Sequence, residues 1–164
     1  YRGYGTGKLM KDEQFDANLA GAKAHDKLLG FYFFSQAITE DEARAEADFC
    51  ASVAPTGYPL FFDAEWSRSV HDGRADSLTK AQRTACAQAF CKRAVALGYQ
   101  PGVYASTLWF RNRLDLSQLS QYPIWNAHYN VASSPIPCQM WQGTCTARIP
   151  GYNGQIDVNI SYMG

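Results

Sequence analysis

The first 120 residues alternate between two hydrophobic patterns, and this alternation restricts the fold more than any other feature of the sequence. Short continuous apolar runs are typical of strands covered on both faces of a sheet, whereas apolar residues spaced three to four positions apart are typical of helices. Strands that alternate with helices predict βαβ units and a parallel sheet. The expected strands are 28–34, 60–65 and 102–105, and the expected helices are 12–25, 39–53, 79–97 and 106–114.

The pattern changes after residue 120, where strands at 124–129, 139–142 and 155–160 are separated by loops alone. The sequence contains no repeat, low-complexity tract or linker, so we predict one domain over residues 1–164. We therefore expect an α/β fold in which helices follow the early strands and none follow the last three. A capping box, Thr39 to Glu42, is expected to begin the second helix.

Composition narrows the classes of function. Hydrophobic residues make up 46% of the 164 residues and charged residues 18%, which excludes a disordered chain. Fifteen basic and fifteen acidic side chains cancel, so we expect no nucleic-acid partner. No apolar run reaches the length of a transmembrane helix, so we expect no membrane partner. The aromatic fraction of 14% is high and suits sugar binding as well as a core.

The five cysteines favour disulfides and an oxidising environment. Cys138 and Cys145 flank a short segment and could close a hairpin. Cys86 and Cys91 lie on one predicted helix and point roughly 140° apart, so Cys50 could bond to either of them but they should not bond to each other. We expect two disulfides and one spare thiol. The alternative is a set of buried free thiols in a cytosolic protein.

Two carboxylates at the end of a buried strand are the strongest chemical signal. Asp63 and Glu65 stand at positions i and i+2, so both side chains emerge on one face at the carboxyl end of the strand, where sites form in α/β sheets. Neighbouring acids in an apolar wall repel each other and raise one pKa, as a general acid requires. Asp157 is a third acid within a short strand. The alternative roles are helix caps, ion pairs or structural hydrogen bonds.

Aromatic residues at or near the predicted strands form a second layer of candidates. Their rings could stack on sugar faces at the mouth of a barrel, or they could simply fill the core. No nucleophile elbow, Walker A or zinc-protease motif occurs. The candidate aromatic residues are Tyr32, Tyr104, Trp125, Tyr129 and Trp141.

Several short motifs occur in an order that resembles the family 25 glycoside hydrolases, the Ch-type lysozymes or N-acetylmuramidases. The resemblance covers essentially the whole chain. It implies an irregular TIM-like (β/α) barrel in which helices follow the first five strands and none follow the last three. The motifs are Arg2-Gly3-Tyr4-Gly5, Gly30-Phe31-Tyr32-Phe33-Phe34, Phe62-Asp63-Ala64-Glu65, Pro101-Gly102-Val103-Tyr104, Trp125-Asn126-Ala127-His128-Tyr129, Met140-Trp141-Gln142 and Ile156-Asp157-Val158-Asn159.

The resemblance implies a retaining lysozyme that hydrolyses the β-1,4 bond between N-acetylmuramic acid and N-acetylglucosamine in peptidoglycan. Glu65 would be the general acid and base, and Asp63 and Asp157 would stabilise an oxocarbenium or oxazolinium ion. The five aromatic residues and Asn159 would bind the sugar, and neither a metal nor a cofactor would be needed. We expect a monomer that is secreted or released onto the bacterial cell wall. The alternatives are a non-catalytic cell-wall-binding or degenerate module and a chitinase-like glycosidase, although the extra acids of the chitinase motif are absent before Asp63.

The resemblance also implies a strand and a helix that are not present in this sequence. Members of the family begin with a first strand bearing an Asp, followed by a helix, whereas Tyr1 here corresponds to the end of the second strand. Because a β-α-β unit takes roughly 30 residues or more, we expect a segment of that size to be missing before Tyr1.

Overall fold

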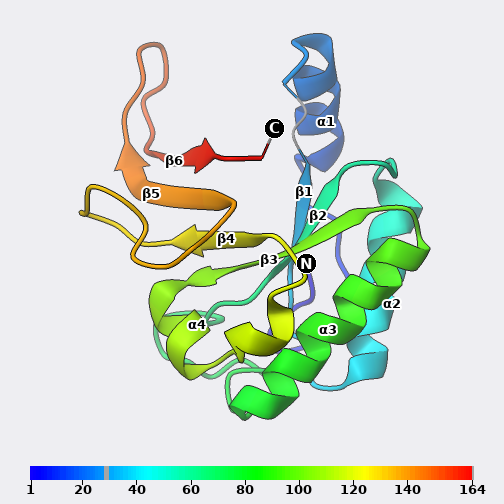
Figure 1. Cartoon of the computed structure of the whole chain (residues 1–164). Coiled ribbons are helices and arrows are strands. Elements are labelled where there is room, and N and C mark those ends of the chain that lie inside the picture. The colour runs from blue at the N-terminus through cyan, green and yellow to red at the C-terminus, as the bar shows by residue number, and fades with distance from the viewer. Residues whose placement is uncertain (28–29, 164) are drawn as a thin grey trace.

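A computed structural model describes residues 1–27 and 30–163 of the chain (Figure 1). Strands and helices alternate as the hydrophobic periods predict. The strands are β1 (Phe31–Phe34), β2 (Pro59–Asp63), β3 (Gln100–Ser106), β4 (Ile124–Ala127), β5 (Met140–Ala147) and β6 (Ile156–Ser161). The helices are α1 (Phe15–Ala24), α2 (Glu40–Val53), α3 (Lys80–Ala96), α4 (Thr107–Asn112) and the 3₁₀ helix η1 (Leu116–Leu119).

The strands form one six-stranded sheet whose spatial order is the order of the sequence. Strands β1 to β5 pair in parallel and β6 pairs antiparallel to β5. The sheet is curled, so the strand direction turns steadily from β1 to β6 (Figure 1). The α/β class is therefore confirmed, as is the absence of helices after β4 within residues 124–163. In the described part of the chain β1 and β6 are the two edges of the sheet, and closure into a barrel stays a prediction.

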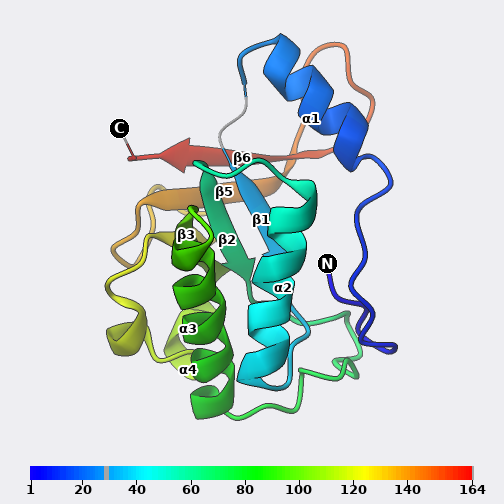
Figure 2. The ribbon, with the colours of Figure 1, turned by 90° about the vertical axis from the view of Figure 1, so that its right-hand side faces the viewer.

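Helices α2 and α3 lie side by side and cover one face of the first strands (Figure 2). The core forms where their apolar sides meet β2 and β3. Phe62 and Phe90 are fully buried there, with ring centroids 5.3 Å apart. Burial of such rings is the main stabilising term for this half of the molecule. The carboxyl ends of β2 and β3 are thereby fixed on a rigid layer.

The starts of these two helices use different capping contacts. At α2, the Thr39 side chain accepts a hydrogen bond from Glu42 N, as predicted. The reciprocal half of the predicted box is wrong, because the Glu42 carboxylate accepts from Ile38 N and pairs with Arg74 instead. At α3, Thr79 and Gln82 form the complete reciprocal box.

Strand β1 is shorter and more exposed than its apolar sequence indicates. It begins at Phe31, while Leu28 and Leu29 lie outside the described residues. The prediction of a strand covered on both faces is wrong, because Phe33 is buried but the Tyr32 side chain is 64% exposed. Helices cover only one side of this edge strand.

A buried ion pair attaches the first residues of the chain to α2. Arg2 Nε donates to Glu46 Oε1 over 2.8 Å, and Ser35 Oγ donates to Glu46 Oε2 over 2.7 Å. Arg2 N also donates to Phe34 O at the end of β1. Burial of the Glu46 carboxyl raises its pKa to about 7, against the opposing effect of Ser35 and Arg2. This network links the N-terminal segment, β1 and α2.

The predicted disulfides are not formed, and all five cysteines are free thiols. Cys86 and Cys91 direct their sulfur atoms at the backbone oxygens of Ala37 and Gly102, and Cys50 is separately buried in α2. Burial raises the pKa of the Cys86 thiol to about 11. Cys145 lies within β5, which begins after Cys138 and is extended rather than a hairpin. From Met140 to Cys145 that strand spans roughly 17 Å. Cys138 lies only two residues before Met140, so it is too far from Cys145 for a disulfide.

In the described residues no helix is long and apolar enough to cross a membrane.

Candidate functional site

A cavity of about 270 Å³ opens at the carboxyl ends of the first strands and reaches across to β6. It gathers the three acids singled out in the sequence, together with three of the five predicted aromatic residues. It therefore combines charge with flat apolar surface. Its lining residues are Tyr32, Phe34, Asp63, Glu65, Tyr104, Trp125, Gln142 and Asp157.

A larger cavity of about 530 Å³ lies between α1, β1 and α2. Its walls are mainly apolar side chains such as Phe15, Phe31 and Phe49, and none of the three candidate acids lines it. Size alone would favour this cavity, but convergent titratable groups are the better sign of chemistry. We therefore take the smaller cavity as the candidate site.

Asp63 and Glu65 reach this cavity in different environments. Asp63 is the last residue of β2 and is 5% exposed, whereas Glu65 follows it by two residues and is open to solvent. The Asp63 Oδ1 atom is buried without a hydrogen-bond partner. Burial, and next the charge of Glu65, raise the pKa of Asp63 well above its ordinary range, against an opposing effect of Arg83. The two acids thus meet in one site, as their spacing predicts.

Asp157 approaches the pair from the opposite edge of the sheet. It lies near the start of β6, and its Oδ2 accepts a hydrogen bond of 2.9 Å from Gln142 Nε2 on β5. The pKa of Glu65 is raised, first by burial and then by the charge of Asp157. Acids that are about 90 residues apart in the sequence therefore act on one another electrostatically.

Trp125 is the centre of the aromatic wall. Its ring is 4.8 Å from the Tyr104 ring and 6.5 Å from the Tyr32 ring, both in edge-to-face orientations. Its Nε1 donates to Asn159 Oδ1 on β6 over 2.9 Å. Asn159 therefore contributes by holding the indole, although it does not line the cavity. The wall joins strands β1, β3, β4 and β6.

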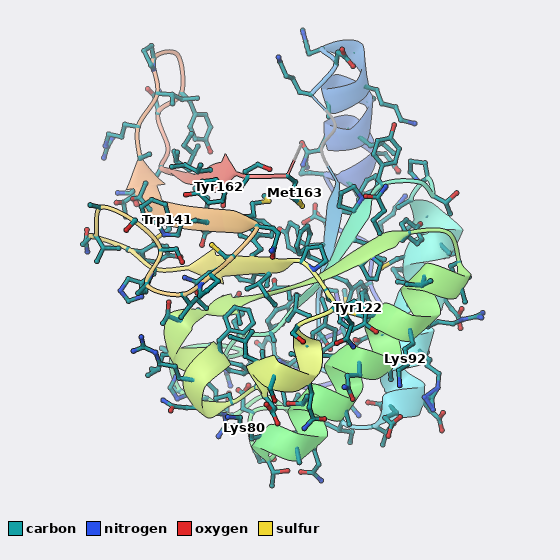
Figure 3. All side chains as sticks on the ribbon, viewed as in Figure 1. Lys80, Lys92, Tyr122, Trp141, Tyr162 and Met163 are labelled. Atoms are coloured by element: carbon teal, nitrogen blue, oxygen red, sulfur yellow. The ribbon has the colours of Figure 1, made fainter. Side chains whose placement is uncertain are left out.

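The other two predicted aromatic residues lie outside the cavity lining. The Tyr129 hydroxyl donates to Oε1 of the cavity-lining Gln142 over 2.7 Å, so it supports the cavity wall. Trp141, labelled in Figure 3, is buried, and its Nε1 donates to His128 O over 2.9 Å. Trp141 precedes Gln142 on β5, and neighbouring residues of a strand face opposite ways. Because Gln142 faces the cavity, Trp141 points away from it.

Sequence reasoning missed Gln142 and Phe34 as lining residues. Phe34 ends β1, and Gln142 sits in β5 opposite Asn159 of β6 and Ala127 of β4. The alternation of β5 contained a signal for Gln142, since one of the pair Trp141 and Gln142 had to face the acids. Trp141 was the predicted member of the pair because of its aromatic ring, whereas Gln142 is the member that lines the cavity.

The segment after Glu65 is held by a compact network. Asp76 accepts hydrogen bonds from Ser67 Oγ and from Gly73 N, which closes the loop from 67 to 76. Trp66 stacks on His71 with ring centroids 4.1 Å apart, and the Arg113 guanidinium lies 4.7 Å from the Trp66 ring centroid. These contacts fix the backbone next to Glu65.

Comparison with known proteins adds to this geometry. The family described as Glycosyl hydrolases family 25 matches residues 5–152. A search of curated proteins gave no match.

Solved structures show the same arrangement of strands and helices. The CTP1L endolysin is 27% identical, with a TM-score of 0.75 over 93% of this chain and 54% of the endolysin. The autolysin LytC from Streptococcus pneumoniae, solved with a synthetic peptidoglycan ligand, is 20% identical, with a TM-score of 0.79 over 92% of this chain and 37% of LytC. A muramidase from Trichobolus zukalii is 20% identical, with a TM-score of 0.73 over 96% of this chain and 78% of that enzyme. This chain thus spans about half or less of the first two proteins.

Proposed function

The chain belongs to the glycosyl hydrolases family 25, and from that premise we propose that it hydrolyses the β-1,4 bond between N-acetylmuramic acid and N-acetylglucosamine in peptidoglycan. The observation that carries the proposal is the convergence of Asp63, Glu65 and Asp157 in one cavity beside an aromatic wall. Glycosidases need paired carboxyl groups at the scissile bond, and rings such as Trp125 suit the flat face of a sugar.

Glu65 is the proposed general acid. A general acid has to keep its proton near the working pH, and both burial and the charge of Asp157 raise the Glu65 pKa. Glu65 is also more exposed than Asp63 and lines the cavity, so its carboxyl group can reach the leaving oxygen and then serve as the base for the attacking water. Asp63 is enclosed, which makes it a poorer donor to the glycosidic oxygen.

Asp63 and Asp157 are the proposed stabilisers of positive charge at the anomeric carbon. Asp63 lines the cavity, so its carboxyl group can orient the substrate's 2-acetamido group as an internal nucleophile. This gives an oxazolinium ion and a retaining outcome. A carboxylate that attacks the anomeric carbon directly is the other retaining route. The aromatic wall of Tyr32, Tyr104 and Trp125 would hold the sugar during either route.

The finer features of the protein follow from the same family. We propose that the curled sheet belongs to an irregular TIM-like barrel, and that the protein works as a monomer on the cell wall after secretion or release. The substrate face would be the cavity between β2 and β6.

Product analysis tests the proposal. The chain is incubated with purified peptidoglycan, the fragments are reduced with borohydride, and their reducing ends are identified by mass spectrometry. We expect reduced muramic acid ends. Glu65→Gln should lower the rate by about two orders of magnitude or more, because a group that donates no proton replaces the acid.

The matched control is Glu13→Gln, the same exchange at an exposed position before α1. It should leave the rate unchanged. Reduced glucosamine ends would contradict the assigned bond. No products from the parent chain, together with retained binding to peptidoglycan, would favour a wall-binding module instead.

A further inference from the structure

Gln142 makes three hydrogen bonds to side chains that come from three different segments of the chain. Its Oε1 accepts from the Tyr104 hydroxyl over 2.9 Å and from the Tyr129 hydroxyl over 2.7 Å. Its Nε2 donates to Asp157 Oδ2 over 2.9 Å. Gln142 itself is buried on β5. One amide in the cavity wall thus connects β3, the segment after β4, and β6.

The orientation of this amide is determined by its partners. A carboxylate accepts hydrogen bonds but cannot donate them, so the NH₂ group of Gln142 has to face Asp157. The amide oxygen then faces both phenols, and each phenol hydroxyl donates a hydrogen bond to that oxygen. The Tyr104 oxygen keeps its lone pairs for other donors, and Tyr104 lines the cavity.

We propose that Gln142 is a positioning residue, which fixes the Asp157 carboxylate and turns Tyr104 into a hydrogen-bond acceptor for a sugar O–H or N–H. This inference rests on the proposed function and deepens it. Asp157 is exposed and stands on an exposed strand, so the core does not hold its side chain. The Gln142 amide therefore holds Asp157 in place, as packing in the core holds Asp63.

The key variant is Gln142→Glu, which keeps the size of the side chain. One carboxylate oxygen can still accept from both phenols, but the other faces Asp157, where two negative charges repel unless they share a proton. Other titratable groups also face this position. They are Glu65 and Asp63 across the cavity, Tyr32 on β1, Cys145 on β5, and Tyr104 and Tyr129 themselves.

We expect the variant to be close to the parent in kcat at acidic pH, where the pair holds a proton. As the pH rises and that proton leaves, kcat should fall about tenfold or more relative to the parent, with a smaller change in KM. Gln142→Met, which lacks all three hydrogen bonds, should lose kcat at every pH. Gln100→Glu, the same exchange at an exposed position at the start of β3, is the matched control and should follow the parent profile.

A second readout does not depend on activity. Carboxyl ¹³C NMR of Gln142→Glu should show the introduced carboxyl and Asp157 titrating as a coupled pair, with one step raised above the ordinary carboxyl range. If the parent chain releases no products but the pair is coupled, the proposed function fails and the positioning geometry stands. Independent titration of the two carboxyls would overturn the inference. So would a pH profile of Gln142→Glu that parallels the parent, with Gln142→Met within twofold of the parent kcat.

Discussion

The two halves of the sheet hold their parts of the cavity by different means. Under α2 and α3, strands β2 and β3 are packed into the core, where Phe62 and Val103 are fully buried. At the other end, the β5–β6 hairpin extends away from those helices (Figure 1), and Val158 and Ile160 are 42% and 47% exposed. The candidate acids are divided between these halves. Asp63 stands on the packed half and Asp157 on the exposed hairpin.

This difference shows how one cavity can combine a rigid and an adjustable side. Asp63 and the backbone before Glu65 are placed by the packing of the core, which resists small displacements. Asp157 is placed by a single hydrogen bond from Gln142, and the indole of Trp125 is joined to the hairpin by one hydrogen bond to Asn159. Changes in the packed half should therefore alter the free energy of unfolding, whereas changes in the hairpin should alter activity or affinity.

Truncating one core side chain and one hairpin side chain should show the largest difference in stability between the two halves. Phe62→Ala removes a fully buried ring from β2 and should lower the free energy of unfolding by about 3–5 kcal/mol. Ile160→Ala removes a half-exposed side chain from β6 and should cost about 1 kcal/mol or less. Urea unfolding of both variants measures the two values. Equal losses would show that the hairpin is as much a part of the core as β2.

The Glu46 network should make the stability of the packed half depend on pH. The pKa of Glu46 is raised from its ordinary 4.5 to about 7, so the folded state binds the proton more tightly than the unfolded state. The raised pKa contributes about 3 kcal/mol to the free energy of unfolding at low pH. This stabilisation is fully present below pH 4.5 and is lost as the pH rises to about 7.

Unfolding measured from pH 4.5 to pH 8 checks this expectation against Glu46→Gln. The variant cannot titrate, so its stability should change less over that interval. Parallel curves for the two proteins would show that Glu46 is charged in the folded state throughout the interval.

The fold was predictable where hydrophobic periods are local. The alternation of strands and helices, the later loss of helices and the common face of Asp63 and Glu65 all follow from short-range spacing. The exposure of Tyr32 was not predictable in this way, because an edge strand and a central strand can share the same apolar sequence. The outcome for β1 depended on which neighbours cover it.

The acids of the site could be predicted from the sequence, but the residues that hold those acids in place could not. Charge on an apolar strand marks Asp63 without any tertiary information. Gln142 gains its role only from the register of β5 with β6 and from the distant Tyr104, neither of which its local sequence contains. Cysteine spacing likewise left disulfides and buried thiols open, and the difference was decided by where each sulfur packs.

The smallest expected effect concerns the hydrogen bond between the aromatic wall and β6. Trp125→Phe keeps an aromatic ring but removes the donor to Asn159 Oδ1. The lost contact should cost about 1 kcal/mol in ligand binding, which is a severalfold rise in KM, with little change in kcat. Kinetics on soluble peptidoglycan fragments measure both constants. A large fall in kcat with an unchanged KM would instead place the indole in the chemical step.

The most direct test of the account is the pH dependence of kcat/KM on peptidoglycan for the parent chain and for Asp157→Asn. The isosteric amide can still accept from Gln142, but it removes the charge that helps to raise the Glu65 pKa. The account predicts that the basic limb of the profile moves to lower pH in the variant, with a reduced maximum. A basic limb that stays in place would contradict the claim that acids from the two halves form one catalytic unit.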